Sequence, residues 1–197
     1  AMLSLTVPAA FVATAHLPLV VDPTTSAIVF IADPVRLERP DIAYDPTLAE
    51  YFAVWQRDFS ALDRDVYAWR LDAGTNSIGA MQAIDVSFSS WEYARVANCD
   101  LADNFLTVAQ VSYAGGATWI GGRLMSPTST GLQFVIEQAG VPGHLGGNKL
   151  YPDVGGDPSP VGPVWYTVVW ERVWTASDHD VHMKQVDTNG VLRSASP

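Results

Sequence analysis

The chain has 197 residues and a formal net charge of −10, with 48% hydrophobic and 16% charged residues. The apolar share excludes intrinsic disorder, and the negative charge disfavours nucleic acid and anionic membrane surfaces as partners. No apolar run reaches the roughly 20 residues that a membrane-spanning helix needs, so we expect no membrane span. Cys99 is the only cysteine, which rules out an intramolecular disulfide and a cysteine metal cage.

Short strands joined by turns are predicted along the whole chain. The 13 prolines and 15 glycines are spread along it, and aromatic residues make up 11% of it. This combination is typical of all-β folds. In chain order, residues 1–35 are expected to form a partial repeat unit or an arm, and strands follow at about 40–45, 50–57, 65–71 and 81–88.

An internal repeat organises the rest of the chain. When the sequence is shifted by 115 residues, nine of the 22 positions from 51 to 72 are identical, against roughly one or two for unrelated segments. The identical pairs include Trp55 with Trp170 and Asp65 with Asp180. A weaker middle copy, at shifts of 54 and 53, places 104–110 on 50–56 and 120–124 on 67–71. The chain therefore contains three copies of one unit.

Each unit predicts four antiparallel strands. The units span about 36–90, 91–140 and 147–197 within a single domain, 1–197, and their spacing of 54 and 61 residues is typical of propeller blades. Strand alternation makes both faces of a unit apolar or aromatic, as in sheets stacked on neighbours on both sides. We therefore predict an all-β, propeller-like array of three to four four-stranded blades. A diverged fourth blade or the association of chains would complete it.

Two segments resemble a repeat common in secreted or surface-attached bacterial proteins: PDIAYDP…EYFAVWQRD…DRDVYAWRLDAGTNSIG and WYTVVWERV…DHDVHMKQVDTNGVL. That repeat reads roughly Pro-x-Val-Ala-Tyr, then Tyr-Leu-Val-Val-Trp, then Asp-Ile-Tyr-Gly-Gln-Arg-Leu-Asp and a glycine turn. The resemblance covers about 40–79 and 151–192, and Ala68-Trp69 and Met183-Lys184 replace the Gly-Gln pair. It implies propeller blades of an extracellular or cell-surface bacterial protein and carries no catalytic signature.

Aromatic residues are the candidate ligand-binding residues. Trp55 and Trp170 share one repeat position, which favours a core role between blades. The other candidates are not tryptophans repeated at equivalent positions of two units. Each of them could therefore be exposed and stack on a sugar ring. They are Trp69, Trp119 and Trp174, together with Tyr67 and its repeat equivalent His182.

Metal binding has only weak support in the sequence. The Asp-x-Asp pairs Asp63/Asp65 and Asp178/Asp180 could offer oxygens to calcium, although such aspartates more often cap turns. His179 and His182 lie three residues apart on a strand and point to opposite sides, which disfavours a joint site. We expect no other cofactor, and the sequence contains no phosphate-loop, dinucleotide or nucleophile motif.

These observations favour a non-catalytic extracellular module that binds a glycan or protein ligand or acts as a scaffold. A lectin-like, carbohydrate-binding propeller is one alternative. A glycoside hydrolase or lyase with carboxylates around a central channel is another, because none of the 21 acidic residues is singled out. A homo-oligomer is expected if three units leave strand edges unpaired.

Overall fold

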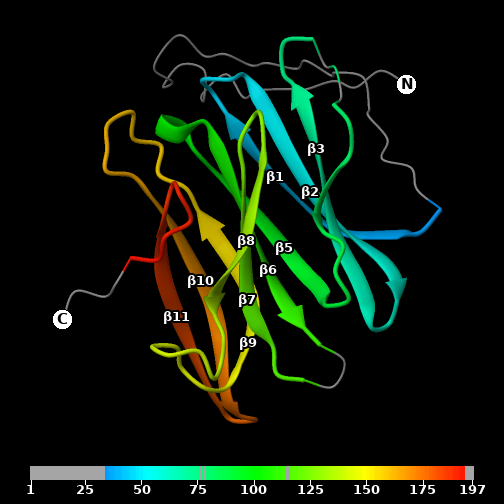
Figure 1. Cartoon of the computed structure of the whole chain (residues 1–197), viewed down its shortest axis with the longest axis vertical. Coiled ribbons are helices and arrows are strands. Elements are labelled where there is room, and N and C mark those ends of the chain that lie inside the picture. Colours follow the sequence, from blue (N-terminus) through cyan, green and yellow to red (C-terminus); the bar gives the residue numbers. More distant parts are fainter. Residues whose placement is uncertain (1–33, 76, 78, 114–115, 194–197) are drawn as a thin grey trace, which may run out of the picture. The chain divides into compact units, whose positions relative to one another are not determined.

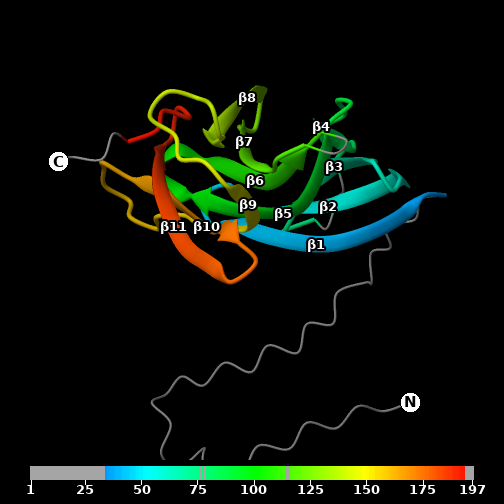
Figure 2. The same ribbon diagram turned by 90° about the horizontal axis from the view of Figure 1, so that it is seen from below.

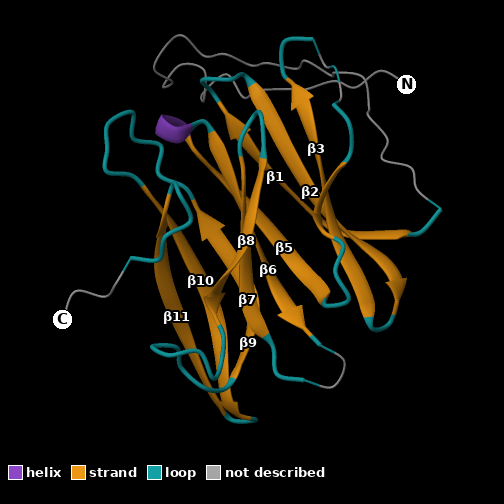
Figure 3. Cartoon of the chain, viewed as in Figure 1, coloured by secondary structure: helices purple, strands orange, loops and turns teal. Residues whose placement is uncertain are grey.

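The structure is a computed structural model that describes residues 34–75, 77, 79–113 and 116–193. Its regular elements in these ranges are antiparallel strands and one 3₁₀ turn, η1 (Asp100–Ala102), which confirms the all-β prediction (Figure 3). The predicted partial unit at 1–35 lies outside the described residues, apart from its last two. No helix in the described ranges is long and apolar enough to cross a membrane.

The strands form three sheets that follow one another along the chain (Figure 1). The first sheet contains, in spatial order, β1 (Arg36–Asp45), β2 (Glu50–Ser60), β3 (Asp63–Asp72) and β4 (Gln82–Asp85). The second contains β5 (Ser90–Cys99), β6 (Asn104–Ser112), β7 (Trp119–Met125) and β8 (Thr130–Glu137). The third contains β9 (Asn148–Gly155), β10 (Trp165–Thr175) and β11 (Asp178–Asp187).

The third sheet departs from the predicted four strands, because its described part has three. After β11 the backbone turns tightly: the Asp187 N–H donates to the Val191 carbonyl at 2.9 Å. The Asp187 carboxylate also accepts the N–H groups of Asn189 and Val191, each at 2.8 Å. The chain then begins to return along β11 through one bridge, Val186 to Leu192, within the few residues described beyond the turn.

The strand registers reproduce the 115-residue repeat. Tyr51 lies opposite Leu71 in the hairpin of β2 and β3, and Tyr166 lies opposite Val186 in the hairpin of β10 and β11. Both hairpins carry a bulge at the same place, after Asp58 in one and after Val173 in the other. The two copies therefore share backbone pairing as well as sequence.

The middle copy follows a slightly different alignment from the predicted one. Phe105 lies opposite Met125, so Met125 and not Leu124 is the equivalent of Leu71. A shift of 54 residues then relates the first three strands of the first and second sheets, and a shift of 52 relates β4 to β8. The shift of 53 predicted for β7 is wrong because it matched Arg-Leu to Arg-Leu, whereas strand pairing sets the register and a one-residue slip exchanges the two faces.

Each sheet has two different faces, which we name from the first sheet. The valine face carries Phe52, Val54, Val66 and Ala68, and the tryptophan face carries Tyr51, Trp55, Tyr67 and Trp69. The equivalents on the other sheets follow from the repeat. On the second sheet, the valine face includes Leu106 and Val108, and the tryptophan face includes Phe105 and Ala109. On the third sheet, the valine face includes Val169, Val181 and Met183, and the tryptophan face includes Tyr166 and Trp170.

The sheets stack with one consistent polarity. One core cluster joins the valine face of the first sheet to the tryptophan face of the second, where the Phe52 and Phe105 rings stack at 4.9 Å. The other joins the valine face of the second to the tryptophan face of the third, where Trp170 is buried. β5 lies between β1 and β9, so these first strands form the inner edges of the stack (Figure 2). The second sheet buries both faces, as the sequence predicts.

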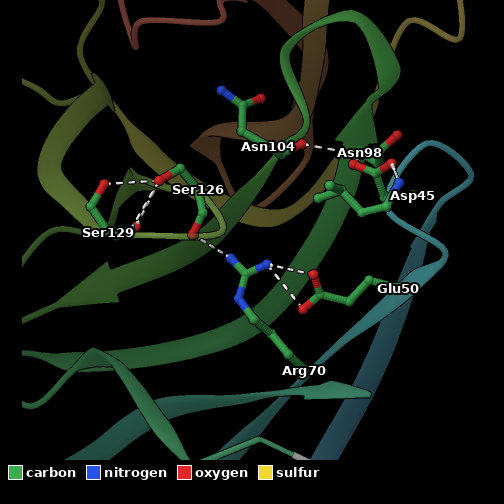
Figure 4. Close-up of polar contacts among 8 residues, drawn as sticks. Asp45, Glu50, Arg70, Asn98, Asn104, Ser126 and Ser129 are labelled. Atoms are coloured by element: carbon green, nitrogen blue, oxygen red, sulfur yellow. Dashed lines mark hydrogen bonds and ion pairs between the residues drawn. The ribbon is translucent and has the colours of Figure 1, made fainter. Parts of the chain in front are cut away.

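Polar groups also cross the junction between the first and second sheets (Figure 4). The Arg70 guanidinium donates to both Glu50 carboxylate oxygens, at 3.0 and 3.1 Å, and to the Ser126 carbonyl at 2.6 Å. The Asn98 side-chain amide donates to the Asp45 carboxylate at 2.8 Å. These contacts satisfy charged groups that the stack would otherwise leave partly buried and unpaired.

A second kind of polar contact repeats at both junctions, and we call it the cation latch. Arg123 on β7 donates to the Ile84 carbonyl on β4. At the equivalent position of the third sheet, Lys184 donates to the Ile136 carbonyl on β8 at 3.1 Å and lies 2.5 Å from the Glu137 carboxylate. In each case a cation on the tryptophan face reaches the outermost strand of the preceding sheet.

Candidate functional site

A hollow of about 270 Å³ lies beside the second sheet and is the best-built candidate site in the described part of the chain. Four aromatic residues line it together with the polar residues Ser87, Ser89 and Gln133. The aromatic residues are Trp91, Tyr113, Trp119 and Phe134. Trp119 is one of the predicted ligand-binding residues. The other lining residues were missed at the level of sequence.

The strands of the second sheet hold the aromatic groups in place. Tyr113 directly follows β6 and Trp119 begins β7, so the hairpin brings their rings to a centroid distance of 5.0 Å. The Tyr113 ring is 59% exposed, whereas Trp119 is buried behind it. Gly121 lies below, where a Cβ atom would come within 2.9 Å of the Trp91 ring and of Val111. The absence of a side chain at Gly121 therefore allows the Trp91 ring to pack close to β7.

A buried carboxylate organises the polar side of the hollow. The Asp85 carboxylate accepts the Ser87 backbone N–H at 3.0 Å and the Ser87 hydroxyl at 2.9 Å. It also accepts the Gln133 side-chain amide at 2.5 Å. Since Asp85 is itself buried, the groups that line the hollow are hydroxyls and an amide. The hollow thus combines an aromatic surface with uncharged hydrogen-bonding groups.

A second hollow, of about 230 Å³, shares Tyr113 with the first. It is lined by hydroxyl groups and by Glu92, whose carboxylate accepts the Ser90 hydroxyl at 3.1 Å and pairs with Arg64 at 2.8 Å. Tyr113 is therefore a ridge between an uncharged aromatic hollow and a more polar one. A ligand longer than one ring could contact both.

The inner strands carry a separate repeated feature. Arg39, Tyr93 and Tyr151 occupy equivalent positions at the bulges of β1, β5 and β9, and each has a positive φ, between 50° and 56°. The Arg39 guanidinium lies 3.8 Å from the Tyr93 ring centroid, and the Tyr93 and Tyr151 rings meet edge to face at 4.8 Å. The neighbouring Tyr93 raises the pKa of Tyr151. These strained bulges aim three side chains at one another along the inner edges of the sheets.

The structure does not gather the predicted ligand-binding residues into one site. Trp69 is half-buried beside Trp55, at a ring distance of 5.3 Å, and Tyr67 is half-buried below the Arg57 guanidinium. His182 is half-buried and stacks on Trp170 at 6.2 Å. Trp174 is exposed, and its indole N–H donates to the Asp180 carboxylate at 3.0 Å. Of the five, Trp119 lines a hollow.

The predicted calcium ligands lie at the starts of β3 and β11. Asp63, Asp178 and Asp180 are exposed, and Asp65 is buried. Burial, with the negative charges of Asp63 and Asp85, raises the pKa of Asp65 to about 6. Within the described ranges, the His, Cys, Asp and Glu side chains form no group of three or more that could hold a metal ion. Asp65 lines none of the hollows described above.

Comparison with known proteins identifies the class of fold. No family model and no curated protein sequence matches the chain. Among solved structures it is similar to a thermostable family-43 glycoside hydrolase, with a TM-score of 0.52 and 11% identity over 85% of this chain and 60% of that one. It also matches a neuraminidase-like protein from A/bat/Guatemala/164/2009, with a TM-score of 0.47 and 10% identity over 81% of this chain and 40% of that one.

The likeness to the glycoside hydrolase shows the fold alone. Together with the repeated antiparallel sheets, it places the chain among proteins of β-propeller type. The chain spans about 60% of the length of that hydrolase.

Proposed function

We propose that the chain is a non-catalytic binding module of propeller type and that its ligand is a saccharide. The Tyr113–Trp119 pair at the rim of the aromatic hollow carries this proposal. A sugar ring presents an apolar C–H face, which packs on an aromatic ring. Its hydroxyl groups need donors and acceptors; the Ser89 hydroxyl offers both, and the Gln133 side-chain oxygen offers an acceptor. A small number of polar groups around an apolar surface is the usual composition of a ligand site.

Two further observations support a saccharide over other small ligands. The groups that line the hollow are uncharged, which suits a neutral ligand. One similar solved structure is a glycoside hydrolase, so a related fold accommodates glycosides. The resemblance of the repeat to secreted and surface-attached bacterial proteins supports an extracellular or cell-surface location for the module.

Screening on a glycan array, followed by calorimetric titration of the best ligand, tests the proposal. Tyr113→Ala should weaken binding at least about tenfold, which corresponds to about 1.4 kcal/mol. The ring is mostly exposed, so its removal should leave the fold intact. Trp174→Ala is the matched control, because Trp174 is an exposed aromatic residue that lines none of the hollows described here.

Two results would contradict the proposal. If Trp174→Ala abolished binding and Tyr113→Ala did not, the hollow beside the second sheet would not be the site. If the bound glycan were cleaved during prolonged incubation with the wild-type chain, the module would be catalytic.

A further inference from the structure

Two apolar sheet faces have no sheet packed on them in the described part of the chain. One is the tryptophan face of the first sheet, where Ile42, Tyr44 and Tyr51 are 57%, 43% and 37% exposed. The other is the valine face of the third sheet, where Val181 and Met183 are 82% and 64% exposed. Contiguous exposed apolar side chains of this kind mark interaction surfaces.

The equivalent residues elsewhere in the stack are buried. Val66 and Ala68, which correspond to Val181 and Met183, are both 0% exposed. Tyr166, which corresponds to Tyr51, is also 0% exposed. Trp55 is the exception, because it is 3% exposed, as is its equivalent Trp170. The exposed parts of the free faces therefore carry residue types that the same fold covers where another sheet is present.

The polarity of the stack determines which face fits which. At both internal junctions a valine face meets a tryptophan face, and like faces do not meet. The two free faces are one of each kind. The valine face of the third sheet can therefore accept the tryptophan face of a first sheet, in the same way as the internal junctions.

The cation latch indicates which sheet is the partner. The latch position holds Arg123 in the second sheet and Lys184 in the third, and both reach the outermost strand of the preceding sheet. In the first sheet the position holds Trp69, which is uncharged and cannot form this contact. In its described residues, a third sheet has only the Val186–Leu192 bridge beyond β11 and no full outermost strand for a cation to reach. The first sheet is thus matched to a third sheet.

We propose that a second copy of this chain docks head to tail on the first, with the valine face of each third sheet covering the tryptophan face of the other copy's first sheet. Two copies then form a closed ring of six sheets with two identical junctions. Six lies within the number of blades found in propellers. A heterologous contact of this kind ends growth only when the ring closes.

Sedimentation of the full chain and of surface variants tests this arrangement. The wild-type chain should be a dimer, and Val181→Glu and Ile42→Glu should each be monomeric, because a buried glutamate would remain unpaired. Each variant should still unfold cooperatively, since both side chains are exposed in the single chain. Leu132→Glu is the control: Leu132 is 89% exposed on β8, away from both free faces, and the variant should remain a dimer.

Mixing the two monomeric variants distinguishes head-to-tail docking from pairing of like faces. Val181→Glu keeps an intact tryptophan face and Ile42→Glu keeps an intact valine face, so an equimolar mixture should form a dimer through one intact junction. A monomeric wild-type chain would overturn the proposal, as would a wild-type assembly larger than a dimer. A dimeric Val181→Glu variant or a mixture that stays monomeric would also overturn it.

Discussion

At the scale of single residues, Asp65 makes the stability of the fold depend on pH. Burial and neighbouring carboxylates raise its pKa to about 6, above the ordinary value of 3.8. The folded chain therefore holds this proton more tightly than the unfolded chain. As pH falls from 7 through 6 toward 4, Asp65 contributes increasing stability, and at neutral pH its charge costs at most about 3 kcal/mol.

We therefore expect Asp65→Asn to be more stable than the wild type at pH 8, by about 1–3 kcal/mol. The difference should shrink as pH falls toward 4, because the wild-type carboxyl is then neutral. Urea unfolding across this pH range measures both effects. Asp178→Asn, at an exposed aspartate that begins β11, should change little at any pH. A constant difference between Asp65→Asn and the wild type would contradict the assignment.

Gly121 is the second residue for which the structure predicts an effect of substitution on stability. A Cβ atom there would approach both the Trp91 ring and Val111 at 2.9 Å, and these packed groups cannot move without repacking the junction. We expect Gly121→Ala to lower the free energy of unfolding by about 1–3 kcal/mol, and to weaken ligand binding because Trp91 lines the hollow. At Gly155 a Cβ atom meets no other atom, so Gly155→Ala should be close to neutral. Equal effects of the two changes in denaturant titrations would contradict this reading.

At the scale of elements, the cation latch ties β11 to β8. Glu137 is buried, and it accepts the Leu145 backbone N–H at 2.5 Å as well as pairing with Lys184. Replacing Lys184 by methionine would remove the basic group that lies closest to this carboxylate, at 2.5 Å, and leave His144 at 3.7 Å. We expect a loss of about 1–3 kcal/mol, less than for a fully buried pair because Lys184 is partly exposed.

Hydrogen exchange can localise this effect. Lys184→Met should increase exchange in β8, β11 and the segment 138–147, which Glu137 and Lys149 hold through backbone contacts. Arg36→Met removes an exposed side chain that pairs with the partly exposed Glu38, so it should cost less than about 0.5 kcal/mol and leave exchange in those segments unchanged. Uniformly raised exchange in Lys184→Met would argue against a local latch.

The elements also show what the sequence could and could not predict. The hairpins of β2 with β3 and β10 with β11 were predictable, because nine identities in one ungapped alignment define a shared register. The register of β7 was not, because its short Ile-Gly-Gly-Arg-Leu segment has two identities with β3 in the displaced alignment and none in the true register. The cation latch could not be predicted from the sequence, because its acid and its cation lie in different units and no local sequence pattern joins them.

At the scale of the whole molecule, the repeat predicted a stack of sheets but not the ligand site. Trp119 was a candidate because it is an aromatic residue outside the repeat pattern. Tyr113, Ser87 and Gln133 come together with it through pairing between β6, β7 and β8 and through the connection from β4 to β5. Bringing these residues together depends on tertiary packing. A sequence repeat predicts only the features that the units share.

The bulges at Arg39, Tyr93 and Tyr151 have a consequence for assembly. A bulge bends its strand and increases its local twist, so these three positions contribute to the angle between one sheet and the next. If the six angles between neighbouring sheets sum to a full turn, the ring closes with two chains. If each angle differs slightly, the differences add up around the ring and leave a gap, and further copies would then add as an open spiral. Three left-handed backbone residues would then help to decide between a discrete particle and a fibre.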